Sequence, residues 1–490
     1  MIHFSGWDIG VVLLYVAGVL GIGWYAVRRQ RARSVAEFLL AGRSLTVPVF
    51  VMTLVSTWYG GILGVGEFTY SVGIATWVMQ GVPYYIFAIL FAFLLAGRIR
   101  SAGGITIPDR LEQVYDRRTA FLGAWLTFLL MTPAPYVLMI GVLIQMITGW
   151  GLPLCILSGT IVTGVFLLAG GFRADVYTDV YEFILMFAGF GLILPFAVHA
   201  YGGWDFLAAH LPPLHLTWHG GSSPQFIIVW FFIALWTLVD PSFYQRCAAA
   251  SSPDVARRGI LWSVLFWVIF DMMTATVGLY ARAALPGITQ PVMAYPLIAE
   301  ALLPPVAKGF FFVGLLATMM STLNTLMLVS GTMLGRDMVR LMRGWREQGS
   351  TVYGARSTEH EAGLQDGEEA GKHERRRVQW GMVVSAVLAI GLALAVPSVI
   401  KLWYVIGTTL VPGLLVPLVT SYFDDLRVDA RTAFYAMLGG WLTSLIWMLA
   451  GWQLQYGSAE SYPWGIEPMF PGLAVSVAVW MWGKMRARTT

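Results

Sequence analysis

Long apolar runs dominate this chain and decide the class of fold it can adopt. At about 20 residues per helical crossing of a hydrocarbon core about 30 Å thick, each run is long enough to span a bilayer. Only 12% of the 490 residues are charged, against about a quarter in soluble domains. The sequence therefore predicts an all-α polytopic membrane protein in a lipid bilayer, and it excludes a soluble enzyme and a nucleic-acid binder. About thirteen transmembrane helices are predicted, at 7–27, 46–70, 75–97, 119–148, 153–171, 176–200, 224–247, 259–285, 306–340, 378–397, 400–422, 432–451 and 466–483.

The basic residues are sorted between the two faces that these spans define. If the N-terminus lies outside, nearly all of the 31 Lys and Arg residues fall on one face, and only Arg282, Lys308 and Lys401 fall on the other. Positive charge gathers on the cytoplasmic side of membrane proteins. We therefore predict a multi-pass protein of the cell membrane with its N-terminus outside, its C-terminus in the cytoplasm and no removable signal peptide. Arg246 is assigned to the cytoplasmic face.

Two hydrophilic segments interrupt the apolar pattern. The segment at about 341–377 is rich in Glu, Gly and Arg without an apolar period, which is typical of a disordered linker, here on the cytoplasmic face. The outer loop 201–223 carries His210, His215 and His219. No carboxylate or cysteine completes a familiar metal site there, so we expect a solvated loop.

Polar side chains inside spans are the places to look for chemistry, because each needs a partner or a cavity in the bilayer. Thr318, Ser321 and Thr325 share one helix face of the ninth span, with Thr322 and Asn324 on its two sides. Such a stripe offers several oxygens to a small hard cation. Its hydroxyls can equally bond to the helix backbone or to neighbouring helices, so the residues alone leave both interpretations open.

Glycines mark a second unusual place, in the second span. Gly60, Gly61, Gly64 and Gly66 follow one another closely, where helix propensity is poor and the backbone can unwind. Unwound backbone at membrane depth lines a cavity and exposes carbonyl oxygens that bind cations. Close helix packing through small residues is the alternative, and the composition does not decide between the two.

Four stretches together resemble the sodium/solute symporter family. They are FLLAGRSL at 38–45 leading into VSTWYGG, AGGFRADVYTDVYEFILMFAGF at 169–190, YQRCAAASSPDVARRG at 244–259 and LATMMSTLNTLMLVSGTMLGRD at 316–337. The resemblance implies one membrane transport domain over 1–490 with a leucine-transporter-type fold. Inverted five-helix repeats would cover about 46–200 and 224–422, with one helix before them and two after.

The resemblance also implies ion sites, with sodium as the coupling ion. The common sodium site would take the backbone carbonyls of Val55, Trp58 and Thr318 and the hydroxyls of Ser321 and Thr322. A possible second cation would lie at Asp179, Ser321, Asn324 and Thr325, although some two-sodium members have serine where this chain has Asn324. Asp240 is expected to brace the inner gate with Arg246, while the roles of Glu67 and Asp271 stay open.

The solute site is implied at the unwound part of the first core helix and on the third, sixth and tenth core helices. Because no Arg or Lys lies in the interior of a core span, a carboxylate or phosphate would lack its usual partner. We expect a neutral or zwitterionic solute, while Glu67 and Asp271 would permit an amine. The candidate solute-binding residues are Trp58, Tyr59, Tyr136, Trp230, Trp236, Trp403 and Tyr404, with Thr132 and Gln145 as further positions.

The leading hypothesis is a sodium-coupled symporter, functioning as a monomer, that moves a small polar organic solute into the cell by alternating access. One alternative is proton coupling through Asp179 and Glu182. Another is a solute sensor that keeps the symporter fold without transport; the lack of a kinase or receiver region after Thr490 counts against it. No paired catalytic motif is present, so we predict that the chain is not an enzyme.

Overall fold

The computed structural model describes residues 2–29, 35–343, 365–396, 399–452 and 462–489. The regular elements of these residues are helices. The longer ones are α1 (Gly6–Arg29), α3 (Val47–Trp58), α4 (Ile62–Val72), α5 (Val82–Phe91), α8 (Arg117–Leu130), α9 (Ala134–Thr148), α10 (Leu152–Tyr201), α12 (Pro224–Ile233), α13 (Pro241–Ala249), α14 (Pro253–Ala284), α16 (Ala307–Thr332), α18 (Gln365–Ala395), α19 (Val399–Thr420), α20 (Ala430–Trp452) and α21 (Met469–Thr489). The shorter ones are α2 (Val35–Leu40), α6 (Gly97–Ala102), α7 (Ile107–Val114), α11 (Trp204–His210) and α15 (Ala294–Leu302).

The all-helical class is confirmed, and each predicted apolar run lies on one or two of these helices. Within the described residues, eleven helical segments are long and apolar enough to cross a membrane. The runs at 153–171 and 466–483 are not among them. The first holds only a shorter apolar helix, Leu152–Val165, and the second lies on α21, which ends in basic residues such as Lys484 and Arg486. The count of thirteen therefore stays a prediction.

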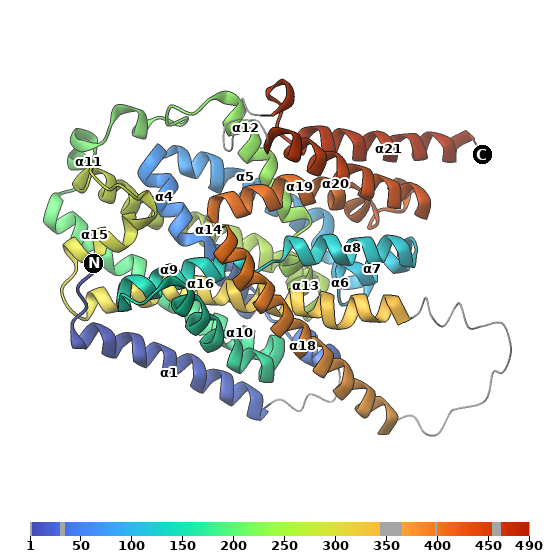
Figure 1. Cartoon of the computed structure of the whole chain (residues 1–490), viewed down its shortest axis with the longest axis horizontal. Coiled ribbons are helices and arrows are strands. Elements are labelled where there is room, and N and C mark those ends of the chain that lie inside the picture. Colours follow the sequence, from blue (N-terminus) through green and yellow to red (C-terminus); the bar gives the residue numbers. More distant parts are fainter. Residues whose placement is uncertain (1, 30–34, 344–364, 397–398, 453–461, 490) are drawn as a thin grey trace.

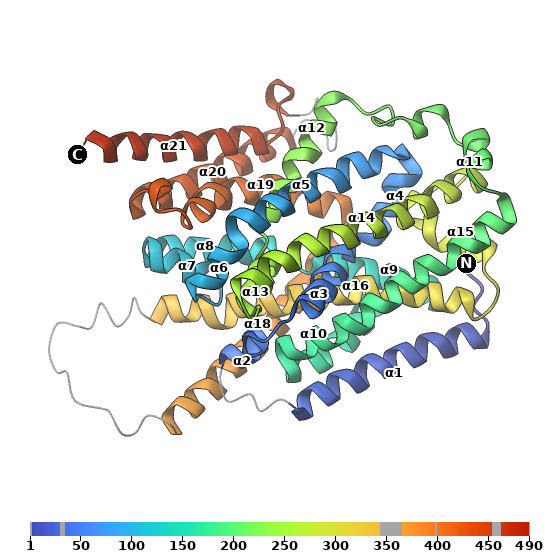
Figure 2. The same ribbon diagram turned by 180° about the vertical axis from the view of Figure 1, so that it is seen from behind.

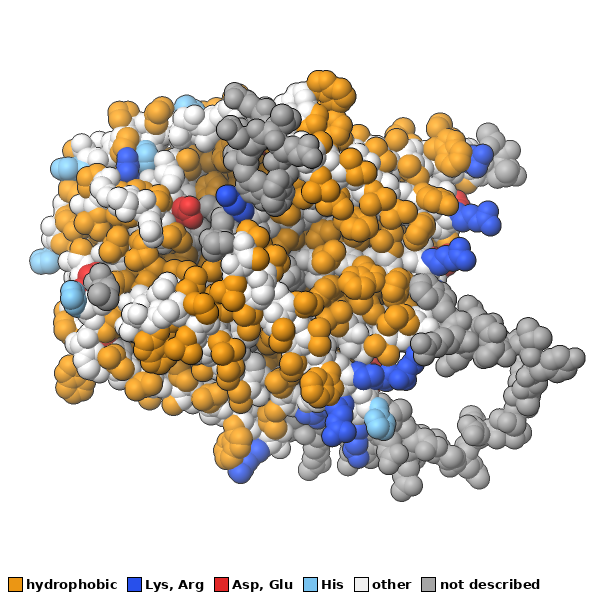
Figure 3. Space-filling model, viewed as in Figure 1, with side chains coloured by type: hydrophobic (Ala, Val, Ile, Leu, Met, Phe, Trp, Pro, Cys, Tyr) orange, Lys and Arg blue, Asp and Glu red, His pale blue; other side chains and the backbone are white. Residues whose placement is uncertain are grey.

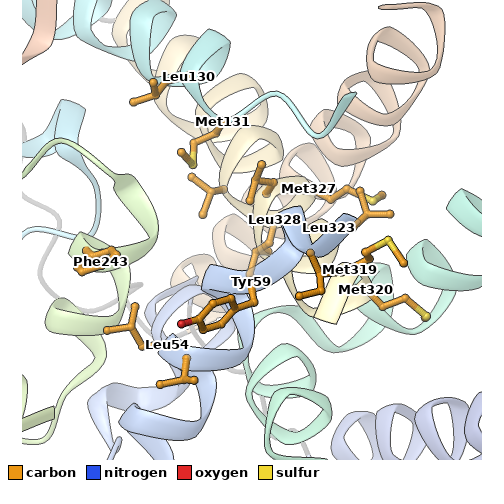
Figure 4. Close-up of a cluster of buried hydrophobic side chains, with 14 of the residues drawn as sticks. Leu54, Tyr59, Leu130, Met131, Phe243, Met319, Met320, Leu323, Met327 and Leu328 are labelled. Carbon is orange, nitrogen blue, oxygen red and sulfur yellow. The ribbon is translucent and has the colours of Figure 1, made fainter. Parts of the chain in front are cut away.

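Helix α16 forms the centre of the molecule. It packs against α1, α3, α9, α10 and α18, and the apolar part of its length is buried inside the protein. Figures 1 and 2 show the helices running along the long axis of the molecule, with α1 at one edge and α20 and α21 at the other. Met319, Leu323 and Met327 of α16 belong to the same buried hydrophobic cluster as Leu54 and Tyr59 (Figure 4). Any ligand held by α16 is therefore deep in the protein.

Apolar side chains cover the sides of the bundle. Leu14 on α1, Val387 on α18 and Ile446 on α20 are exposed by more than three fifths of their surface. Hydrophobic side chains cover most of the face in Figure 3, and most of the Lys and Arg side chains visible there lie at the end of the molecule on the right. A large exposed apolar surface of this kind fits a lipid environment.

Spans five and six of the prediction meet at Gly171 with almost no connection between them. The helix α10 covers both, and Gly171 interrupts it with φ +55° and ψ −150°. A β-carbon at this position would lie 2.5 Å from the Phe38 ring and 2.7 Å from the Phe38 carbonyl oxygen. The close approach and the positive φ both require glycine. The break directs the part of α10 that follows Gly171 into the protein interior, where Asp175 and Asp179 are buried.

The predicted disordered linker at 341–377 is partly wrong. Residues 344–364 lie outside the described residues, but α18 already begins at Gln365. The sequence EEAGKHERRR supplies strong helix formers. The end of the predicted linker is therefore the first part of a membrane helix.

An ion-pair network joins this part of α18 to the predicted cytoplasmic loop 98–118. Arg336 pairs with Asp109 of α7 at 3.1 Å and with Glu374 of α18 at 3.0 Å. Arg340 pairs with Asp109 at 2.9 Å and also with Glu112. The network ties α7 and α18 to the end of the central helical segment.

The outer loop is less solvated than predicted, because His215 is buried in it. Its Nε2 lies 3.0 Å from the carbonyl oxygen of Tyr70, and burial lowers the pKa of His215 from its ordinary value of 6.5. The neutral ring is therefore favoured in the folded state. The stability that it contributes is present above pH 6.5 and is lost as the pH falls through the lowered pKa.

We expect acidification from about pH 7.5 to about pH 5.5 to lower the unfolding temperature of the detergent-purified protein, in part through His215. A His215→Gln variant should lose less stability over this interval than the wild type. His210→Gln, which changes an exposed histidine of the same loop, is the matched control and should follow the wild type. Equal pH dependence in the wild type and in His215→Gln would contradict this account.

Candidate ion and solute site

The second span is interrupted by a 3₁₀ turn where its glycines lie. A 3₁₀ turn at Tyr59–Gly61 separates α3 from α4. The backbone is tightened rather than extended there, because Tyr59 and Gly61 have ψ angles of 13° and 19°. The absent side chains of Gly60 and Gly61 let the turn approach Thr322 and Trp403. The turn therefore meets the central helix α16 at close range.

The seventh span has a matching interruption in its middle. A 3₁₀ segment at Ala234–Leu238 precedes α13. Asp240 caps α13, because its Oδ1 accepts hydrogen bonds from the Ser242 backbone N–H at 2.7 Å and hydroxyl at 2.6 Å. An acid followed by proline is a helix-start signal, and it marks this break. The expected brace between Asp240 and Arg246 is thus wrong, since Asp240 caps the helix and Arg246 pairs elsewhere.

Arg246 is the centre of a fully buried charged cluster and does not lie at the cytoplasmic surface where the sequence placed it. One guanidinium nitrogen, Nη2, lies 3.2 Å from Asp179 Oδ2 and 3.8 Å from Asp175 Oδ2. The correction has a physical cause: the break before α13 and the break at Gly171 turn these residues inward. When Asp175, Asp179 and Arg246 are all ionised, their net charge is −1.

Hydroxyl groups surround the same guanidinium. Its Nη2 donates to the hydroxyls of Thr53 at 3.0 Å, Thr57 at 2.6 Å and Thr325 at 2.9 Å. Thr325 in turn donates to Asp175 Oδ2 at 2.9 Å. The cluster therefore joins α3, α10, α13 and α16.

The predicted sodium residues lie next to this cluster, where α3 and the turn that follows it meet α16. Ser321 donates to Asp179 Oδ1 at 2.6 Å, and Thr322 donates to the Thr57 carbonyl oxygen at 2.5 Å. The Thr318 hydroxyl bonds back to the Leu315 carbonyl at 2.7 Å, which leaves the Thr318 carbonyl as the group assigned to the ion. Val55 and Trp58 lie on α3, which packs against α16.

Three of the four residues predicted for a second cation, Asp179, Ser321 and Thr325, are joined by hydrogen bonds around Arg246. Asp179 and Thr325 both contact its Nη2, while Ser321 contacts the other oxygen of Asp179. Asn324 is buried with neither its amide nitrogen nor its carbonyl oxygen in a hydrogen bond to a described residue. A positive charge, that of the guanidinium, thus lies beside Asp179 and Thr325.

Several buried oxygens of the cluster have no hydrogen-bond partner among the described residues. They are Asp175 Oδ1, Glu182 Oε2 and Asn324 Oδ1. Glu182 uses its other oxygen, Oε1, to accept from the Tyr15 hydroxyl of α1 at 2.9 Å. Buried acceptors are normally satisfied by donors, water or ions, so these three oxygens are available to a water molecule or an ion.

A cavity of about 160 Å³ adjoins the cluster. All seven predicted solute-binding residues line it, together with Thr132, whereas Gln145 does not. The seven come from α3, α9, α12, α19 and the breaks of the second and seventh spans. Thr57 and Thr322 also line the cavity, so the cavity reaches the predicted sodium residues.

Sequence reasoning missed one wall of this cavity. It is formed by the third span, with Trp77, Gln80, Tyr84 and Tyr85, and by α14, with Asp271 and Thr274. A π-helical segment at Trp77–Gly81, just before Pro83, brings the first of these side chains inward, and such segments often mark functional sites. Pro83 after Gly81 was the only sequence signal for it. Of the two acids whose roles the sequence left open, Asp271 lines the cavity and Glu67 does not.

The contact at Gly60 gives a direct test of this geometry. A β-carbon there would lie 2.3 Å from Thr322 Cβ and 2.6 Å from the Tyr136 ring. We expect Gly60→Ala to destabilise the protein by about 1–3 kcal/mol through overpacking and to weaken stabilisation by sodium. Gly21→Ala, where no atom lies within 4 Å, is the control. Equal unfolding temperatures and sodium responses for both variants would rule out this close approach.

Comparison with known proteins agrees with the geometry. The family description "Sodium:solute symporter family" matches residues 38–352. The chain belongs to the sodium:solute symporter family. Proteins of this symporter family are membrane transporters and not enzymes, and the predicted family and transport class are thereby confirmed.

Relatives of this symporter chain extend over nearly its whole length. The sodium/pantothenate symporter of Escherichia coli (strain K12) is 26% identical over 96% of this chain and 95% of its own. The osmoregulated proline transporter of Bacillus subtilis (strain 168) is 25% identical over 95% and 93%. The high-affinity choline transporter 1 of Drosophila melanogaster is 23% identical over 99% and 79%. These relatives carry chemically different solutes.

Solved structures show the fold of this symporter chain. A Na⁺-coupled sialic acid symporter, in a substrate-bound outward-open state, covers 100% of this chain and 98% of its own, with a TM-score of 0.76 and 14% identity. MhsT in complex with L-phenylalanine covers 88% and 97%, with a TM-score of 0.52 and 15% identity. The leucine-transporter-type fold is confirmed.

Proposed function

We propose that this protein couples the inward movement of one sodium ion to the uptake of a small polar organic solute across the cell membrane. The supporting observation is the buried cluster at α16. Two aspartates and one arginine carry a net negative charge, and neighbouring oxygens of Asp175, Glu182 and Asn324 have no partner among the described residues. A site of net negative charge with free oxygens suits one small cation.

The proposed ligands are the carbonyl oxygens of Val55, Trp58 and Thr318 and the hydroxyls of Ser321 and Thr322. The hydroxyl of Thr322 donates to the carbonyl oxygen of Thr57, on α3 just before the break of the second span. Both Thr57 and Thr322 line the cavity. An ion held there would link the break to α16 and complete one wall of the cavity. Binding of sodium would thereby favour binding of solute, since the two sites share elements.

Each transport cycle would be coupled to one sodium ion, because Arg246 supplies the positive charge at the predicted second cation site of Asp179, Ser321, Asn324 and Thr325. Repeats at about 46–200 and 224–422 would move relative to each other around this centre. Their first helices carry the two breaks, at Tyr59–Gly61 and Ala234–Leu238, as expected for alternating access.

Uptake into proteoliposomes tests the proposal. A panel of pantothenate, proline, glucose and choline would be offered under a sodium gradient, a pH gradient without sodium, or a potassium gradient. We expect accumulation only with sodium, with a Hill coefficient for sodium near one. Accumulation driven by the pH gradient alone would instead favour proton coupling through Asp179 and Glu182. Binding without accumulation under any gradient would favour a solute sensor.

A further inference from the structure

Asp271 is an acid in the wall of the cavity whose charge is not matched by a basic residue. It lies near the middle of α14 and is partly exposed to the cavity. Its Oδ2 accepts from the Tyr85 hydroxyl, and Trp77 Nε1 donates to that hydroxyl oxygen at 3.2 Å. No described residue forms an ion pair with Asp271, and the neutral Tyr59 is a further hydrogen-bonding neighbour of its carboxylate.

The other acid of the cavity is already compensated. Asp240 accepts the Ser242 backbone and hydroxyl donors and caps α13, whose N-terminus carries partial positive charge. The acids of the buried cluster share Arg246. Asp271 is the cavity acid left with neutral tyrosine and tryptophan neighbours.

The cavity as a whole is suited to positive charge. No Lys, Arg or His is among its described lining residues. Its walls carry tryptophan and tyrosine rings from several helices, including Trp58, Tyr84 and Trp403. Trp58 and Tyr84 pack edge to face with ring centroids 5.2 Å apart. Aromatic faces attract organic cations, more strongly when water is excluded.

We propose that the solute is an organic cation with an alkylated ammonium head, held by the Asp271 carboxylate and the surrounding rings. This rests on the proposed transport function and names its substrate class. An anion would meet Asp240 and Asp271 without a basic partner. A metal cation prefers a shell of oxygens, which these rings do not supply. The E. coli relative is described as a pantothenate symporter, and the two proteins would therefore differ in solute charge.

The experiment measures ligand binding to the full-length purified protein, by thermal shift and calorimetry. The probes are choline, tetramethylammonium and 3,3-dimethyl-1-butanol, which has the shape of choline but no charge, with proline and pantothenate as zwitterionic and anionic probes. We expect at least one of the two cations to bind about 10- to 100-fold more tightly than the neutral isostere. Equal binding of the isostere, or binding of only proline or pantothenate, would overturn the proposal, as would no response to either cation.

Variants of Asp271 distinguish the contribution of the carboxylate charge to binding from that of the cavity shape. Asp271→Asn should lose most of the preference for the cation over the isostere, while Asp271→Glu should keep part of it. Asp254→Asn is the matched control, since Asp254 lies on the same helix in an exposed pair with Arg258 at 2.9 Å. If Asp271→Asn is unfolded, a folded Asp271→Glu or Tyr85→Phe variant carries the test. Unchanged cation preference in every folded variant would exclude Asp271 as the anchor.

Each titration is run in sodium and in potassium. Failure of the inferred substrate class can then be distinguished from failure of the proposed sodium coupling. Cation preference with equal affinity in both salts would support the substrate class and count against sodium coupling. Sodium-dependent binding of a neutral or anionic probe alone would support coupling and overturn the substrate class.

Discussion

Replacing Arg246 by alanine is expected to destabilise the protein by about 3–5 kcal/mol, the usual effect of removing one partner from a buried ion pair. The guanidinium is fully buried, and it contacts Asp179 and three threonine hydroxyls. Without it, Asp175 and Asp179 would face each other with uncompensated charge. Arg246→Lys should recover only part of the loss, because one ammonium group cannot reproduce the geometry of a guanidinium.

Thermal or denaturant unfolding in detergent measures this effect. Arg258→Ala is the matched control, since Arg258 forms an exposed pair with Asp254 and such pairs contribute about 0–1 kcal/mol. Adding Asp175→Asn and Asp179→Asn to Arg246→Ala should restore part of the stability by removing the unpaired charges. If Arg246→Ala is as stable as Arg258→Ala, the cluster does not hold the folded state together as described.

The second large effect is expected from Thr322→Ala. Its hydroxyl joins α16 to the break of the second span through the Thr57 carbonyl oxygen, and it is a proposed sodium ligand. A hydrogen-bonding or ligand contact to a charged group contributes about 1.5–3 kcal/mol, so sodium affinity should fall by about 10- to 100-fold. Ser321→Ala should act in the same direction, because Ser321 also contacts Asp179.

Sodium titrations of thermal stability and of proteoliposome uptake would measure the loss. Thr332→Ala provides the control on the same helix, since the buried Thr332 hydroxyl bonds only to the Leu328 carbonyl, at 2.7 Å, among the described residues. We expect Thr332→Ala to keep the sodium response of the wild type. Undiminished sodium dependence in both Thr322→Ala and Ser321→Ala would show that the ion binds elsewhere.

Sequence patterns predicted those parts of the structure that depend on local composition. Apolar runs predicted the helices because each run must satisfy its backbone internally in lipid. The glycines of the second span marked it as unusual, and a break lies there. The seven aromatic residues that line one cavity were instead assigned through the family resemblance.

Long-range placement could not be predicted in the same way. Arg246 stands near the end of an apolar run and so resembled a surface residue, but the break at Ala234–Leu238 turns α13 inward. Asp175 lies between the predicted spans 153–171 and 176–200, yet the turn at Gly171 buries it. The role of Asp271 stayed open from the sequence, because its neighbours Tyr85 and Trp77 belong to another span. In each case the partner comes from a distant segment.

The covalent attachment of Arg246 has an electrical consequence. A bound ion can leave on either side of a membrane, but a guanidinium fixed to α13 stays with the protein throughout the cycle. Each proposed cycle would therefore move only the charge of one sodium ion and of the solute. With a singly charged organic cation, two charges would cross, and a membrane potential of about 100 mV would supply about 4.6 kcal/mol. The transport current per solute molecule would then be twice that of a neutral solute carried by the same centre.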